Sequence, residues 1–387
     1  MTGRPMIDEF LGDIEDGVAS FGQVGSSLLS DALSAEIFET MDPRASLEPL
    51  VFACFNARSI ERDLPQIIFR YLPGNFRPEQ LAVTSNSGGA VCVPLLGDFL
   101  TSRQNATLSL TCRGDEFRLS DDVGKDVSFD REACLPFQMI RLPVRCHPLT
   151  EALYATDLDC CRQSSLVTVS NREAMIHALN ILQIVSPEYW AALIACTKEI
   201  VIFSNPAKNS FASLSSYGTA FINVLGDKNA TPFFLEDTIH QCGHIMFSAI
   251  DFGRKKFLSE NPDTPLREKT DVTLEHRTLH TTLHGLFTEA LIGSLLDRYL
   301  SESVDVVEAF ECLGRLAFIM NKFAYDLQYM SNRELYTPRG VRLIECFHSI
   351  YHSILSSRAS EFRAISLGRQ QYTFDAAAFF QANPSVR

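Results

Sequence analysis

The sequence contains no uninterrupted apolar run of about 18 residues, the length that a membrane-spanning helix needs. It also lacks a basic excess, because 34 lysines and arginines stand against 47 aspartates and glutamates, for a formal net charge of −13. The first absence argues against a membrane protein, and the second against a nucleic-acid partner bound through a basic surface. The chain has 387 residues, 46% of them hydrophobic, which is enough for a substantial core in one large domain or two.

A secretory signal is also lacking. The amino-terminal segment MTGRPMIDEFLGDIEDG is acidic and has no long apolar centre. The eleven cysteines are odd in number and follow no regular spacing, so they do not resemble a disulfide framework. Together these features predict a cytoplasmic protein with reduced thiols.

The spacing of apolar residues changes along the chain. Residues 1–75 read mainly as helix, whereas residues 76–150 show short alternating runs, with a hairpin predicted around Arg113-Gly114-Asp115. After residue 150 two short buried strands, EIVIFSN and FINVL, precede a helix-like run. A polar loop and three further helices are then expected, at about 251–272, 274–300, 303–331 and 339–358.

These patterns predict an α+β fold that is mostly helical. We expect two regions. Residues 1–150 would form a helical and β-rich amino-terminal part, with substrate recognition as a candidate role, and residues 151–387 a helical, metal-binding catalytic domain.

Histidine, in contrast, is concentrated in one short region of the chain. The segment LEDTIHQCGHIMFS places His240 and His244 four residues apart in an apolar, helix-like run, so both imidazoles lie on one helix face and can reach one metal ion. Metallopeptidases with this spacing carry a glutamate after the first histidine, which deprotonates the metal-bound water. Here that catalytic position holds Gln241, whose amide has no useful basicity, so the pattern predicts a metal site without a hydrolytic base.

A second histidine cluster follows. His276, His280 and His284 repeat the same spacing in EHRTLHTTLHGLFTEALIGSLLDRYL, so we expect them to form a stripe on a second helix. Five of the nine histidines fall within Ile239–Gly285. Two packed helices of this kind can supply three or four nitrogen ligands to one ion.

The order SLSSYGTAFINV, IHQCGHIMF and HRTLHTTLHGLFTEALI resembles the HExxH-motif peptide-modification proteins, which accompany gene clusters for ribosomally made, modified peptides. The resemblance covers roughly residues 170–300. It implies a zincin-like helix pair and an iron(II) and 2-oxoglutarate-dependent oxygenase that hydroxylates peptide side chains. Two positions depart from the family pattern, with Gln241 in place of the motif glutamate and Thr278 in place of a proline.

Carried onto this sequence, the resemblance makes His240, His244 and His284 the ligands of iron(II). It makes Arg277 a candidate for the carboxylate of 2-oxoglutarate, because a guanidinium fork suits a carboxylate. Ser216, in the serine- and glycine-rich stretch, is a second candidate for the cofactor site, with a plain turn as its alternative.

Several alternatives stay open at this stage. Glu289 rivals His284 as third ligand, but on one helix the two side chains lie about 140° apart, so they are not expected to bind the same ion together. Arg277 has a salt bridge to Glu275 or Asp271 as its alternative role. We expect His276 and His280 to lie beside the metal ligands or on the surface. Cys242, His348 and His352 are expected to be packing residues.

The expected function is therefore a non-haem iron(II) and 2-oxoglutarate-dependent oxygenase acting on a peptide or amino-acid side chain, with a precursor peptide as candidate partner. Two other classes remain. One is a zinc metallopeptidase relative that is inactive because Gln241 replaces the base, and the other is a non-catalytic peptide-binding module.

Overall fold

The computed structural model describes residues 6–132, 136–154, 161–225, 230–270, 275–302, 305–368, 370–371 and 373–384. They form two compact units. Unit 1 comprises Met1–Gly17, Ala174–Leu193 and Ala230–Arg387, and unit 2 comprises Val18–Glu173 and Ile194–Asn229. This division differs from the expected one at residue 150, because the chain returns to each unit after leaving it. Among the described residues, no helix combines the length and apolar character needed to cross a membrane.

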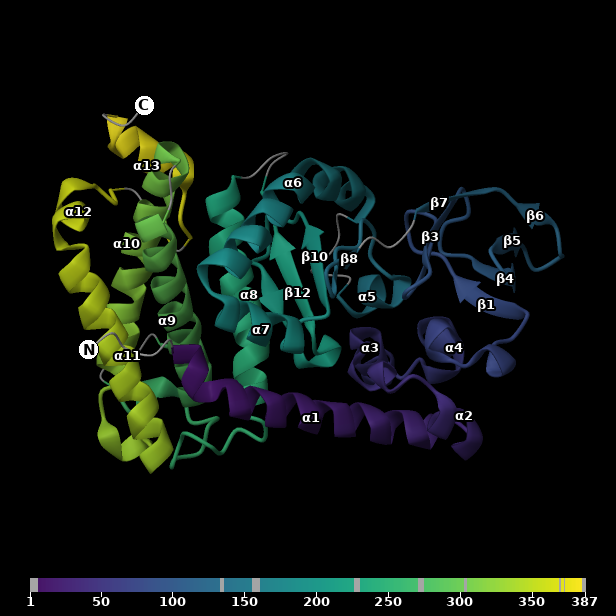
Figure 1. The fold of residues 1–387 in the computed structure, drawn as a ribbon, viewed down its shortest axis with the longest axis horizontal. Coiled ribbons are helices and arrows are strands. Elements are labelled where there is room, and N and C mark those ends of the chain that lie inside the picture. The colour runs from purple at the N-terminus through teal and green to yellow at the C-terminus, as the bar shows by residue number, and fades with distance from the viewer. Residues whose placement is uncertain are drawn as a thin grey trace. The chain divides into compact units, whose positions relative to one another are not determined.

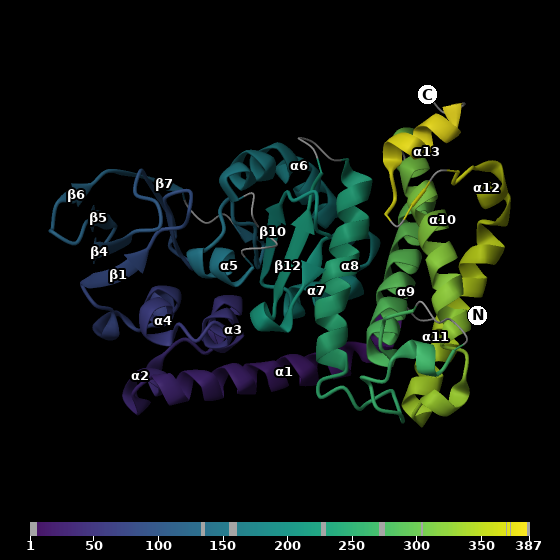
Figure 2. The same cartoon turned by 180° about the vertical axis from the view of Figure 1, so that it is seen from behind.

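Unit 1 is a bundle of long helices (Figure 1). The helix α9 is central, since it packs against α8, α10 and α11, and α9, α10 and α11 run side by side in both views (Figures 1 and 2). The helices that lie wholly in unit 1 are α8 (Thr231–Ile250), α9 (Leu279–Glu302), α10 (Val306–Tyr329), α11 (Pro338–Ser357), α12 (Ala359–Ala364) and α13 (Ala376–Ala382). Their buried residues include the phenylalanines Phe247, Phe287 and Phe323, which are fully buried.

Three helices contribute residues to both units: α1 (Met6–Ala32), α6 (Cys161–Val185) and α7 (Pro187–Cys196). The short helices of unit 2 are α2 (Ala35–Thr40), α3 (Pro49–Asn56), α4 (Ile60–Ile68) and α5 (Pro148–Leu153). The apolar faces of α3, α4 and α5 meet in one cluster that includes Val51, Ile67 and Leu149.

The strands of the described residues all belong to unit 2 and form three sheets. An antiparallel four-stranded sheet has the order β1-β4-β5-β6 and a three-stranded one the order β2-β3-β7. A mixed sheet has the order β11-β12-β10-β9-β8. The strands are β1 (Gln80–Thr84), β2 (Ala90–Val93), β3 (Gly97–Thr101), β4 (Thr107–Arg113), β5 (Glu116–Ser120), β6 (Asp126–Val127), β7 (Phe129–Glu132), β8 (Pro136–Phe137), β9 (Ile140–Arg141), β10 (Glu199–Phe203), β11 (Phe211–Ala212) and β12 (Thr219–Asn223).

The antiparallel strands follow the alternation read from the sequence. In β1 and β4 every second side chain is buried, and these residues join a cluster with Val91 and Phe99 from the neighbouring sheet. The predicted hairpin is confirmed, because Arg113 pairs with Glu116 across a turn in which Gly114 has a φ of +61°. Glycine adopts that left-handed conformation without the steric cost of a side chain.

The two short apolar runs after residue 198 form β10 and β12, which pair in parallel, and all their residues are buried. Burial on both faces explains why these strands read as continuous apolar runs rather than as alternating ones. The prediction of a mostly helical α+β fold is confirmed. The helix expected at about 274–300 begins later, at Leu279, so Arg277 lies before it in the chain.

Candidate metal and cofactor site

The candidate site lies in unit 1, where α8 packs against α9. α8 begins with Pro232 in its first turn, a position at which the missing backbone N–H costs nothing. Gly243, between the two histidines of α8, permits close approach of the helices. A Cβ atom at this position would lie 3.1 Å from Cγ2 of Thr288 and 3.2 Å from Cδ1 of Leu291, both on α9.

This packing brings together the three histidines that the sequence singled out. The ring centroids of His240 and His244 are 4.8 Å apart, and those of His244 and His284 are 4.4 Å apart, with the latter rings nearly perpendicular. Phe247 lies beside His284, with a centroid separation of 4.9 Å, and closes one side of the group. Two helices separated by a long loop therefore deliver three imidazoles to one place.

All three rings are neutral near pH 7. Burial, followed by the charge of Lys322, lowers the pKa of His240 to about 4. Burial also holds the pKa values of His244 and His284 well below their usual range. Each residue keeps some solvent exposure, but the packed helices surround the rings closely enough to disfavour the charged form. Neutral imidazole is the form that binds a metal ion.

Neutral imidazoles are suitable metal ligands, but in this structure the three rings are not arranged around one common point. Within the described ranges, no group of three or more histidine, cysteine, aspartate or glutamate side chains is placed to hold one. Nε2 of His284 lies 3.0 Å from the backbone oxygen of His244, which also accepts a hydrogen bond from Ser248. A carbonyl oxygen only accepts, so Nε2 of His284 carries the proton. The ring would have to turn before that nitrogen could bind a metal.

Gln241 is buried on α8, with 2% of its surface exposed. Its Nε2 donates to Oδ1 of Asp237 at 3.2 Å, one turn earlier on the helix. Its Oε1 is buried and has no hydrogen-bond partner within the described part of the chain. This amide oxygen can accept a hydrogen bond but cannot take up a proton at neutral pH.

Arg277 is held between two carboxylates. Its Nη1 and Nη2 donate to Asp326 at 2.6 and 2.7 Å, and its Nε and Nη2 donate to Glu275 at 3.1 and 2.8 Å. The hydrogen bonds that Arg277 donates to Asp326 raise the pKa of Arg277 further. The salt bridge to Glu275 is one of the alternatives considered from the sequence, whereas Asp271 lies outside the described residues. A cofactor carboxylate would have to displace one of the two acids to reach this guanidinium.

The rival ligand Glu289 is only 8% exposed, and its Oε2 lacks a hydrogen-bond partner among the described residues. Burial, and after it the charge of Asp326, raises its pKa well above the usual range. Lys322 and Arg277 oppose that shift. A carboxyl group that keeps its proton is a poor metal ligand, so these surroundings disfavour Glu289 in that role.

The other candidates have different surroundings. His280 has Nε2 at 3.4 Å from Oδ2 of Asp251 and its ring centroid 5.8 Å from that of His284, whereas His276 is exposed and precedes α9. The predicted three-histidine stripe is therefore wrong at His276, because the helix starts two residues beyond Arg277. Ser216 belongs to unit 2, where it is buried and its hydroxyl lies 2.8 Å from that of Tyr154.

Sequence reasoning missed Asp326, the main partner of Arg277. It lies on α10, 49 positions from Arg277, and is 4% exposed. The one available signal is an acidic residue in the apolar helical stretch FAYDLQY, where a buried charge needs a partner. The identity of that partner could not be read from helical spacing.

No protein-family model matches this sequence, and no curated protein shows significant similarity to it. The likeness to the HExxH-motif peptide-modification proteins therefore rests on the short motifs quoted above.

Proposed function

We propose that this protein is a non-haem iron(II) and 2-oxoglutarate-dependent oxygenase that hydroxylates a peptide or amino-acid side chain. The observation that carries the proposal is the contact of three neutral imidazoles, His240, His244 and His284, at the packing of α8 and α9. The family resemblance favours iron over zinc, since imidazole binds both. When bound, iron(II) would supply the oxygen-activating chemistry of this class.

In this proposal the zincin-like helix pair holds the metal, and residues 1–150, with their β-rich part, recognise the substrate. Gln241 is buried and has the size of the motif glutamate, but its amide is not a base. This suits an enzyme that does not hydrolyse peptides. Arg277 orders the start of α9 through Asp326, and the carboxylate of 2-oxoglutarate competes with that acid for it.

A second candidate is a non-catalytic peptide-binding module with a structural histidine cluster. The side-chain placement favours it, because within the described residues no group of three or more histidine, cysteine, aspartate or glutamate side chains is placed to hold a metal ion.

Metal content separates the two candidates. Protein purified without oxygen should contain about one iron per chain, and His240→Ala and His284→Ala should each lose it. His348→Ala, which removes a histidine of α11, is the matched control and should retain the metal. Iron-loaded wild type should then consume 2-oxoglutarate and form succinate in the presence of candidate peptides.

Equal metal content in wild type and both site variants would exclude this site and support the non-catalytic module. Zinc-dependent cleavage of unstructured peptides, abolished by His244→Ala, would instead identify a peptidase and refute the oxygenase.

A further inference from the structure

The helix α11 of unit 1 carries another pair of histidines at the spacing that brings two imidazoles to one helix face. His348 and His352 are four residues apart within Pro338–Ser357. Side chains with this spacing have Cβ atoms about 5–6 Å apart. The ring centroids are 6.3 Å apart, and the ring planes are nearly parallel, with an angle of 17° between them. The backbone of α11 therefore holds both rings side by side.

This pair reaches the surface. His352 is exposed, and His348 is partly exposed. The prediction that both are packing residues is therefore wrong for His352. The physical reason is its position on α11, since His352 follows the fully buried Phe347 by five residues, which is about 140° around the helix.

Within the described residues, neither ring has a polar partner. No hydrogen bond or ion pair in this part of the chain involves a nitrogen of His348 or His352. The other ring beside His352 is that of Tyr351, at a centroid distance of 5.5 Å. A neutral imidazole has one nitrogen with a lone pair that can bind a metal ion. Each of the two rings can therefore offer such a nitrogen to a ligand in solution.

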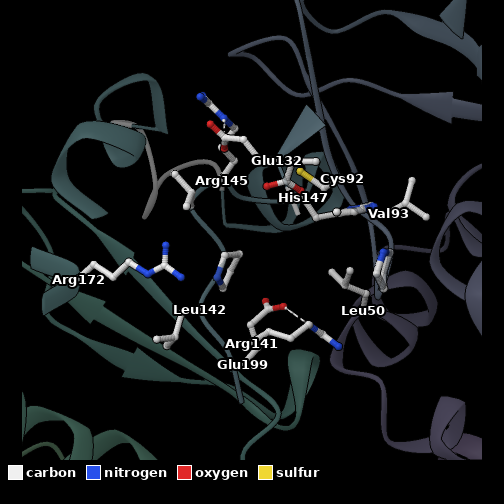
Figure 3. A pocket seen from close by; sticks show the side chains of 15 residues that line it. Leu50, Cys92, Val93, Glu132, Arg141, Leu142, Arg145, His147, Arg172 and Glu199 are labelled. Atoms are coloured by element: carbon white, nitrogen blue, oxygen red, sulfur yellow. Dashed lines mark hydrogen bonds and ion pairs between the residues drawn. The ribbon is translucent and has the colours of Figure 1, made fainter. Parts of the chain in front are cut away.

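The charged groups around the cavity of unit 2 are different, because they pair with one another. This cavity has a volume of about 60 Å³. Figure 3 shows Arg141 beside Glu199 in its wall, and Arg141 also donates to both carboxylate oxygens of Glu48 at 2.7 Å. Arg145 lies 3.7 Å from Glu132. These side chains stabilise one another, whereas the histidines of α11 have no such partners among the described residues.

The geometry of the α11 pair suits a metal ion. An imidazole nitrogen binds zinc at about 2.0–2.1 Å, which places the ion about 3 Å from the ring centroid. Two rings 6.3 Å apart can therefore reach one ion between them after rotation about their side-chain bonds, which solvent exposure permits. Within the described part of the chain, no third histidine, cysteine or acidic side chain completes the group. Water would take the remaining coordination positions.

The ligand type limits which ion can bind. Imidazole suits copper, nickel and zinc, and the affinity of a given site rises from manganese through iron and nickel to copper. Iron(II) stands near the weak end of this order, so two exposed rings are not expected to retain it through purification. His348→Ala therefore remains a valid control for the proposed iron site.

We propose that His348 and His352 form a surface site for copper(II), nickel(II) or zinc(II), separate from the three histidines of α8 and α9. This inference rests on α11 alone and does not depend on the proposed oxygenase function.

Nickel(II) is the probe, because it binds imidazole without oxidising the thiols of the chain. Calorimetric titration of the full chain at about pH 7.5, where imidazole is mostly neutral, measures the number of ions bound and their dissociation constants. His352→Ala removes one ligand at an exposed position, where alanine favours the helix. His276→Ala, at an exposed histidine before α9, is the matched control.

A second variant tests the spacing. Combining His352→Ser with Ser353→His keeps the number of histidines but moves the second ring to five residues after His348, about 140° around the helix. The two rings then cannot bind one ion together.

Wild type should bind one nickel ion at α11. Loss of one of two rings on the same helix removes the chelate, so the affinity of this site should fall at least about tenfold in His352→Ala and in the spacing variant. His276→Ala should match wild type. His284→Ala should keep the nickel ion of α11, which distinguishes this site from the one at α8 and α9.

Three results would overturn the proposal: no nickel binding by wild type, undiminished binding by His352→Ala, or wild-type affinity in the spacing variant. The last result would show that the histidines bind nickel singly and not as a pair.

Discussion

Replacing Arg277 by methionine should destabilise unit 1, because it leaves two carboxylates without their common partner. The side chain of Arg277 donates four hydrogen bonds, two to Glu275 and two to Asp326. Methionine keeps most of the side-chain volume but none of these donors. The change therefore isolates the electrostatic role of Arg277 from its packing.

The magnitude follows from burial. The side chains of Asp326 and Glu275 are 6% and 14% exposed, whereas that of Arg277 is 36% exposed. Breaking a fully buried ion pair costs about 3–5 kcal/mol. Since water screens the exposed part of Arg277, we expect the free energy of unfolding to fall by about 2–3 kcal/mol.

The chain offers a selective probe for this measurement. Trp190, the single tryptophan, lies in the part of α7 that belongs to unit 1 and is 5% exposed. Its fluorescence during urea unfolding should report on unit 1. Arg267→Met, an exposed arginine of the preceding loop, is the control and should change stability by less than about 0.5 kcal/mol.

A second substitution tests the cause. Adding Asp326→Asn to Arg277→Met removes the orphaned charge, so the double variant should be more stable than Arg277→Met alone. The reasoning would be refuted if Arg277→Met unfolded like Arg267→Met. If Arg277→Met weakened 2-oxoglutarate binding but left the free energy of unfolding unchanged, Arg277 would bind the cofactor and would not stabilise the fold.

Two further predictions concern the histidine site. The pKa of His240 is lowered from 6.5 to about 4, so the unfolded chain binds more protons than the folded one between these pH values. The contribution of His240 to stability should therefore be full above about pH 6.5. The free energy of unfolding should fall by about 1–3 kcal/mol as the pH drops toward 4. His240→Asn should show a shallower pH dependence of unfolding, and an unchanged slope would contradict the assignment. Gly243→Val should lose about 1–3 kcal/mol by overpacking against α9. Gly12→Val, at a helical glycine with no atom within 4 Å of an added Cβ, should not, and equal effects at both positions would refute the packing argument.

Local patterns in the sequence determined much of the fold. The hairpin at Gly114 and the buried run of β10 were predicted from the periodicity of apolar residues and from turn chemistry. The spacing of His240 and His244 placed both on one face of α8, since a helix fixes the relation of residues four apart. These features depend on neighbours in the chain, so the sequence alone suffices to read them.

Other features depend on residues far apart, and only the tertiary structure decided them. The spacing of residues along a helix does not predict which nitrogen of His284 faces the backbone of His244, because that depends on how α9 lies against α8. The same holds for the pairing of Arg277 with Asp326, which lie 49 positions apart in the chain. Burial creates the need for a partner, but packing in three dimensions decides which group meets it.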